Sequence, residues 1–146
     1  MFHALLIAGQ FGLAAAIVLS ARWWPVPWTA LLISMPSIVF AVWAWGAIGL
    51  RKVRVQPSTT DQTKLITSGP YSIVRHPMYT GLLWFTAALL ASGFAWWRLG
   101  VWIALLGVLL LKTREEEAAM SKRFADYAGY RSRVGRLLPT WKFSKH

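Results

Sequence analysis

Long apolar runs constrain the fold of this chain more than any other feature. Residues 2–19 are almost uninterrupted apolar sequence, and a second run extends over residues 28–50. A helix rises 1.5 Å per residue, so runs of this length approach or cross a hydrocarbon core of about 30 Å. A cleavable signal peptide is the competing interpretation of the first run, but no basic residues precede it and a second apolar run follows. With 56% hydrophobic residues and 10 tryptophans in 146 residues, the composition predicts a small integral membrane protein.

Two shorter apolar runs follow, separated by the sequence SGFAWWRLG, which is typical of a turn at a membrane interface. The expected fold is a single all-α membrane domain, residues 1–146, with about four transmembrane helices at residues 2–19, 28–50, 78–92 and 96–112. Further along, Met120, Phe124 and Tyr127 recur at spacings of four and three in a charged segment. This spacing predicts a C-terminal amphipathic helix, which can close a site at the membrane surface.

The net charge of +11 is explained by membrane topology better than by nucleic acid, and no nucleic-acid partner is expected. All lysines and arginines except Arg22 and Arg98 flank the segment ends that would share one side of the membrane. This bias is typical of cytoplasmic loops. We therefore expect both termini in the cytoplasm of a bacterial-type inner membrane, with anionic lipids as partners.

The sequence SGPYSIVRHPMYTG, residues 68–81, places polar residues directly before the third apolar run. Pro77 suits the first turn of a helix, which puts His76 at the helix mouth. The free N–H groups there, with the guanidinium of Arg75, predict an anion-binding site. In the alternative interpretation, Arg75 and His76 are ordinary interfacial residues.

The sequence KTREEEAAM, residues 112–120, holds three of the five acidic residues in the chain. A structural interpretation is available, because Thr113 and Glu116 fit a helix-capping box. However, the short turn between the third and fourth runs would bring this segment beside residues 75–79. Carboxylates next to an anion-binding helix mouth suit S-adenosylmethionine, which carries ribose hydroxyls, an ammonium and a carboxylate, and the apolar walls would admit a lipid-borne acceptor.

Taken in this order, the two segments resemble the membrane methyltransferases related to isoprenylcysteine carboxyl methyltransferase and the phospholipid N-methyltransferases. The resemblance spans residues 56–139 and rests on TKLITSGPYSIVRHPMYTG and EEAAMSKRFADYAGYRSRVGRLLP. It implies methyl transfer from S-adenosylmethionine to a lipophilic small molecule or lipidated substrate. No metal is expected, because the carboxylates and His76 lack a convincing ligand spacing. The cofactor region would comprise residues 56–81 and 112–139.

The resemblance also implies roles for individual residues. Lys112 and Glu116 would contact the acceptor, and Arg75 joins them as the guanidinium of the expected anion site. The positions matching the family's cofactor contacts are Gln56, Thr63, Lys64, Leu65, Ile66, Tyr71, His76, Pro77, Met78, Tyr79 and Glu117.

The chain departs from the carboxyl methyltransferases at three positions: Lys112 replaces an arginine, Gly135 a proline and Thr63 a histidine. A lysine cannot grip a carboxylate through two parallel hydrogen bonds, which weakens the case for a carboxylate acceptor. Three alternatives stay open: a lipid amine N-methyltransferase, a non-catalytic membrane interaction protein on the same fold, and a nicotinamide-dependent reductase relative. The sequence leaves open the identity of the acceptor, the atom that is methylated and the oligomeric state.

Overall fold

The computed structural model describes residues 2–48 and 65–140, and in these residues the regular structure is helical. An isolated parallel bridge between Val74 and Gly135 is the one β-type pairing found there. The expected all-α fold is confirmed. In chain order the elements are α1 (Phe2–Leu19), α2 (Trp28–Ile48), the 3-10 helix η1 (Gly69–Ser72), α3 (Pro77–Leu90), α4 (Trp96–Arg123) and α5 (Tyr127–Arg133).

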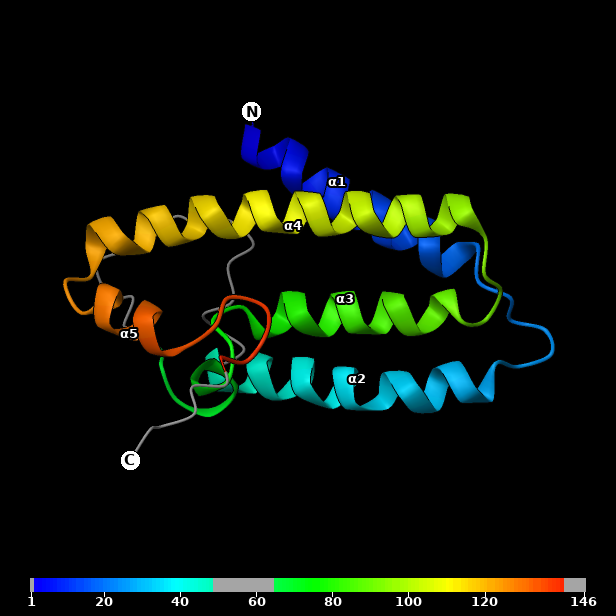
Figure 1. Ribbon diagram of the computed structural model, residues 1–146, viewed down its shortest axis with the longest axis horizontal. Coiled ribbons are helices and arrows are strands. Elements are labelled where there is room, and N and C mark those ends of the chain that lie inside the picture. Colours follow the sequence, from blue (N-terminus) through cyan, green and yellow to red (C-terminus); the bar gives the residue numbers. More distant parts are fainter. Residues whose placement is uncertain (1, 49–64, 141–146) are drawn as a thin grey trace.

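Three of the helices, α1, α2 and α4, are long and apolar enough to cross a membrane. The fourth apolar helix, α3, has 14 residues, which corresponds to about 21 Å and falls short of a full hydrocarbon core. It lies between α2 on one side and α1 and α4 on the other (Figure 1). Protein therefore shelters the short helix, and the chain is an integral membrane protein whose described residues include four apolar helices.

Helix α4 extends further than the apolar run that predicted it. It continues without a break from Trp96 to Arg123, so Thr113 does not begin a helix. The hydroxyl of Thr113 instead donates to the carbonyl of Leu110, 2.9 Å away in the preceding turn. The capping-box interpretation is thus wrong, because the lysine, arginine and glutamate residues that follow are good helix formers and prolong α4 beyond its apolar part.

The expected amphipathic helix over Met120, Phe124 and Tyr127 is divided in two. Helix α4 ends before Phe124, which has an extended backbone, and α5 starts at Tyr127. The apolar side chains nevertheless meet across this bend. They form a small cluster in which Met120, Phe124 and Leu65 pack around Tyr127, Tyr130 and Val134.

Small residues bring α2 and α3 close together. A Cβ atom added to Gly81 would lie 3.0 Å from the carbonyl oxygen of Ser37 and 3.1 Å from the Cβ of Ala41. Ser34 and Ser37 are buried on the same helix and donate their hydroxyls to carbonyls of α2 itself. Close backbone approach through small residues is a common way to pack helices where both water and lipid are excluded.

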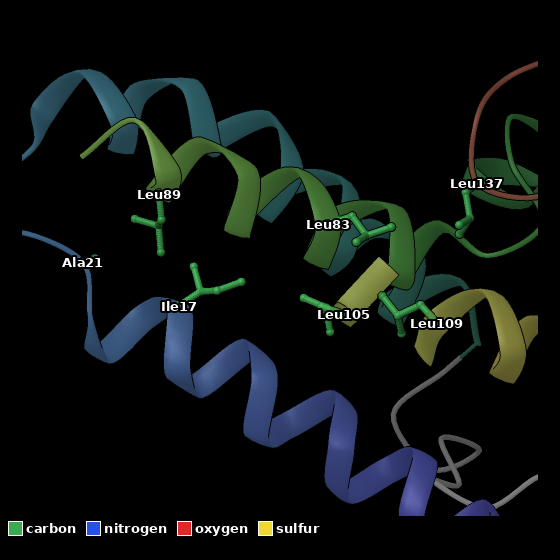
Figure 2. Packing of buried hydrophobic residues seen from close by; sticks show 7 residues of the cluster. All are labelled: Ile17, Ala21, Leu83, Leu89, Leu105, Leu109 and Leu137. Carbon is green, nitrogen blue, oxygen red and sulfur yellow. The ribbon is translucent and has the colours of Figure 1, made fainter. Parts of the chain in front are cut away.

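The main core joins α1, α3 and α4 (Figure 2). Its buried members are Ile17, Ala21, Leu83, Leu89, Leu105, Leu109 and Leu137. Leu137 belongs to the segment after α5, so the C-terminal part of the chain is anchored in the same core as the membrane helices.

A buried arginine fastens the opposite end of the bundle. Arg98, in the first turn of α4, is 2% exposed and donates to the carbonyls of Leu89 at 2.9 Å and Ile17 at 3.4 Å, and also to that of Gly93. Leu89 and Ile17 lie in the last turns of α3 and α1, where carbonyl groups lack helical partners. Arg98 therefore joins three helices at this end.

We predict that Gly81→Leu will destabilise the protein by about 1–3 kcal/mol, because the new side chain must push α3 away from the backbone of α2. Thermal unfolding of the detergent-solubilised protein measures this change. Gly100→Leu is the matched control, since Gly100 is exposed on α4 and has no neighbouring atom within 4 Å of an added Cβ. Equal unfolding temperatures for the two variants would contradict the close packing of α2 and α3.

Candidate active site

A tight turn places the polar residues at the mouth of α3. Gly69 has a φ of 61°, which favours glycine, and a Cβ atom added there would lie 3.7 Å from the ring of Trp43 on α2. Pro70 is buried in η1, and Pro77 is the first residue of α3, as predicted. His76 is the N-cap residue, and its side chain does not cap the helix. The imidazole is therefore free to interact with other elements.

The segment after α5 pairs with the loop before α3. The N–H of Arg75 donates to the carbonyl of Gly135 at 2.8 Å, and the N–H of His76 donates to that of Arg136 at 3.1 Å. The hydroxyl of Thr80 donates to the carbonyl of Leu137 at 2.8 Å. The segment after α5 thus packs directly against the loop before α3 and the first turn of that helix.

Gly135 is required by the path of this segment. A Cβ atom at residue 135 would lie 1.9 Å from the carbonyl oxygen of Leu138, which no real side chain tolerates. Proline also carries a Cβ, so the backbone could not take this path with the proline of the carboxyl methyltransferases.

Glu117 is enclosed by cations. Its carboxylate accepts hydrogen bonds from Nε of Arg75 at 3.0 Å and from Nε and Nη2 of Arg136 at 3.1 and 2.9 Å. Nε2 of His76 lies 3.2 Å away, and the Glu117 side chain is 3% exposed. Burial by itself raises the pKa of Glu117, but the bonds from His76 and Arg136 and the charges of Arg75 and Arg136 outweigh it and lower the pKa to about 2. Glu117 is therefore charged at physiological pH, and Arg75, His76 and Arg136 hold its carboxylate in place.

Glu116 has a different environment, although it is the next residue. Successive helical residues point about 100° apart, which turns Glu116 away from the arginines. Its Oε1 accepts a 2.6 Å hydrogen bond from the hydroxyl of Tyr79, and its Oε2 lies 3.4 Å from Nδ1 of His76. The Glu116 side chain is 23% exposed. It therefore has room for a further partner, which Glu117 lacks.

His76 connects the two carboxylates and stacks on Tyr79. The two rings lie 5.6 Å apart at an angle of 10°. Burial lowers the pKa of His76, but its hydrogen bonds to Glu116 and Glu117 and their negative charges outweigh burial and raise the pKa above its ordinary value of 6.5. The cluster therefore favours the imidazolium form of His76.

Arg75 and Lys112 are both engaged by the chain. Nη1 of Arg75 donates to the carbonyls of Arg131 at 2.8 Å and Val134 at 2.7 Å, in addition to the ion pair with Glu117. Lys112 lies one turn before Glu116 on α4 and donates from Nζ to Oε1 of Gln10 on α1 at 2.9 Å. Nζ of Lys112 also lies 5.1 Å from the centre of the Tyr79 ring.

Tyr71 joins the loop to the small C-terminal cluster. The hydroxyl of Tyr130 donates to its carbonyl at 2.6 Å. Burial, with smaller contributions from Tyr130 and Glu116, raises the pKa of Tyr71 to about 12. Its phenol is therefore neutral at any physiological pH.

The structure unites most of the predicted site residues. Arg75, His76, Tyr79, Lys112, Glu116 and Glu117 form one polar network, Pro77 and Met78 begin the adjoining helix, and Leu65, Ile66 and Tyr71 lie in the loop that leads to it. Gln56, Thr63 and Lys64 lie outside the described residues. Two surface hollows, of about 440 and 510 Å³, lie elsewhere, one beside Arg22 and Ser92 and the other on the outer face of α2. Chemical complementarity therefore supports this site better than surface shape does.

Two residues of the network were not predicted from the sequence, Arg136 and Gln10. Arg136 stands in the quoted VGRLLP motif, but nothing in the motif indicates which carboxylate it binds. Gln10 carried a clearer signal, because an amide in the middle of an apolar span needs a polar partner.

Comparison with known proteins identifies a family. The model of the family described as phospholipid methyltransferase matches residues 26–127. No curated protein and no solved structure gives a significant match. The matched stretch begins before α2 and ends at Tyr127, so it includes His76, Tyr79, Glu116 and Glu117 but leaves out α1 and the segment that carries Arg136.

We predict that His76 titrates above pH 6.5 and that Glu116→Gln lowers its pKa, because the substitution removes one negative charge while burial remains. Histidine nitrogen NMR measures this value, and His76→Asn assigns the signal. A raised folded-state pKa means that the interaction stabilises the protein below pH 6.5 and that this stabilisation is lost as the pH rises through the folded value. A wild-type pKa below 6.5 would show that burial, and not the carboxylates, dominates.

Proposed function

Because the chain belongs to the phospholipid methyltransferase family, we propose that it transfers a methyl group from S-adenosylmethionine to a lipophilic acceptor at the membrane surface. The family model matches residues 26–127, and membership in this family implies a membrane lipid methyltransferase. The position of Glu116 is the observation that most directly supports methyl transfer to such an acceptor. Its partly exposed carboxylate is oriented by Tyr79 and His76 at the end of a bundle of apolar helices.

The residues present at the mouth of α3 fit S-adenosylmethionine. The half-buried aromatic ring of Tyr71 suits a sulfonium cation, which is attracted to ring faces. Half-buried Leu65 and Ile66 offer apolar surface for an adenine ring. When bound, this cofactor supplies an electrophilic methyl group on a positively charged sulfur.

The residues of the chain would hold the acceptor in line with the methyl group of the cofactor and would control the proton of the acceptor. Positioning accounts for most of the rate in such a reaction, because a well-held attack geometry is worth several powers of ten. Glu116 is fixed by a 2.6 Å bond from Tyr79, and the Glu117 cluster fixes the backbone on which Glu116 lies. An acceptor carboxylate is ionised at neutral pH and needs no base. An acceptor ammonium must first lose a proton, and Glu116 is the group placed to take it.

The proposed reaction is of the isoprenylcysteine carboxyl methyltransferase type, in which the acceptor is a lipophilic carboxylate. The buried ammonium of Lys112 supports an acceptor with an anionic group near the reacting atom. N-methylation of a phospholipid amine is the second candidate, and two observations favour it: the family that matches the chain, and the lysine at residue 112. A phosphodiester would satisfy Lys112 as a carboxylate does, while Glu116 would deprotonate the amine.

The location of the site is part of this proposal. The lysines and arginines of the chain, apart from Arg22 and Arg98, flank the segment ends on the side of the candidate site. By the positive-inside rule this side faces the cytoplasm, where S-adenosylmethionine is available in water. A bacterial-type inner membrane would then supply the acceptor from within the bilayer.

We predict that Glu116→Gln lowers the rate of methyl transfer to an amine acceptor by about 100-fold or more while S-adenosylhomocysteine still binds, since removal of a general base costs 10²–10⁴ in rate. The assay uses S-adenosylmethionine with a deuterated methyl group and mass spectrometry of the products, with protein in lipid nanodiscs. Glu115→Gln is the matched control, because Glu115 is exposed on the same turn. An unchanged rate in Glu116→Gln would remove this residue from the mechanism.

The same assay distinguishes the acceptors. A farnesylated cysteine derivative offers a carboxylate, and phosphatidylethanolamine offers an amine. Label in the first supports the carboxyl methyltransferase type, and label in the second supports N-methylation. Wild-type protein that is folded and transfers label to neither acceptor, nor to total membrane lipid, would contradict the proposal and favour a non-catalytic membrane protein on this fold.

A further inference from the structure

Helix α1 lies outside the stretch that matches the family, yet it contributes a side chain to the candidate site. Gln10 stands near the middle of this 18-residue helix, about 12 Å from either end. A polar amide at such depth is costly unless it has a partner. The partner is Lys112, whose Nζ lies 2.9 Å from Oε1 of Gln10.

The contact is buried and well supported by packing. Gln10 and Lys112 are each 8% exposed. Gly9 precedes Gln10, and a Cβ there would lie 3.8 Å from the side chain of Val108, so α1 passes close to α4 just beside the contact. The two helices therefore hold the amide and the ammonium together inside the bundle.

The chemistry of the pair matters for Lys112. An ammonium has three donors; one goes to Gln10, and Nζ also lies over the ring of Tyr79. Both of these partners are neutral. They orient the ammonium without cancelling its charge, whereas a carboxylate at residue 10 would form a salt bridge. The positive charge thus stays available beside Tyr79 and Glu116.

We propose that Gln10 is a positioning residue that holds the Lys112 ammonium, still charged, toward the anionic group of the acceptor. This inference rests on the proposed function. Because Lys112 would contact the acceptor before and during methyl transfer alike, loss of Gln10 should weaken acceptor binding and leave the chemical step almost unchanged. Binding of the cofactor should also be unchanged, because the hydrogen bond that the structure gives Gln10 goes to Lys112, an acceptor contact.

Two substitutions at residue 10 separate positioning from a structural role. Gln10→Met keeps the size of the side chain and removes the oxygen, and we expect the KM for the acceptor to rise about 10-fold, since a hydrogen bond to a charged group is lost, with kcat changed less than twofold. Gln10→Glu strengthens the contact with Lys112 but neutralises the ammonium. A structural role predicts normal kinetics for Gln10→Glu, whereas positioning of a free charge predicts a raised KM. Phe11→Met, on the exposed face of α1, is the control.

A double-mutant cycle completes the test, because a residue that acts through Lys112 has no effect once Lys112 is replaced. Gln10→Met should therefore cause no further rise in KM in a Lys112→Met background. As a readout independent of activity, acylation of Lys112 by an amine-reactive ester, followed by mass spectrometry, should be several-fold faster in Gln10→Met than in wild type.

Failure of this inference differs from failure of the proposed function. Wild-type protein that neither binds S-adenosylhomocysteine nor transfers methyl groups would overturn both. If the wild type is active, four results would overturn the role of Gln10 alone. These are an unchanged acceptor KM in Gln10→Met, a normal KM in Gln10→Glu, a further KM rise in the Lys112→Met background, and unchanged acylation of Lys112.

Discussion

The ion cluster around Glu117 is the interaction on which the rest of the site depends. A buried carboxylate is stable only if its charge is compensated, and here Arg75, Arg136 and His76 compensate it. These residues come from the loop before α3 and from the segment after α5, while Glu117 lies on α4. Removal of one partner from such a cluster costs about 3–5 kcal/mol in general. The cluster thus ties together three segments that are distant in the sequence.

The same cluster gives adjacent glutamates different roles. Once Glu117 faces the arginines, the helical rotation of about 100° per residue turns Glu116 toward Tyr79 and His76. One carboxylate is saturated by permanent cations, while its neighbour has a phenol, an imidazole and partial exposure. Lys112, one turn earlier, faces the same ring of Tyr79. On a single helix, the charge of Glu117 therefore holds the structure together, while the charges of Glu116 and Lys112 stay available for chemistry.

Much of this architecture could be predicted from the sequence, because apolar runs and prolines act locally. The four apolar helices, the start of α3 at Pro77 and the meeting of residues 75–79 with residues 112–117 all follow from such signals. The extent of α4 could not be predicted from the Thr113 capping pattern, because helix propensity in the charged segment prevailed. The partners of Glu117 and Lys112 were also hidden, since Arg136 and Gln10 meet them only through tertiary packing.

Calorimetric titration of S-adenosylhomocysteine into the purified, detergent-solubilised protein tests the central claim most directly, because it asks whether the network at the mouth of α3 holds the cofactor. We expect saturable binding to wild-type protein and its loss in His76→Ala and Tyr79→Ala, because both residues lie at the mouth of α3 and match expected cofactor contacts. The absence of binding in a folded, monodisperse wild-type sample would contradict it.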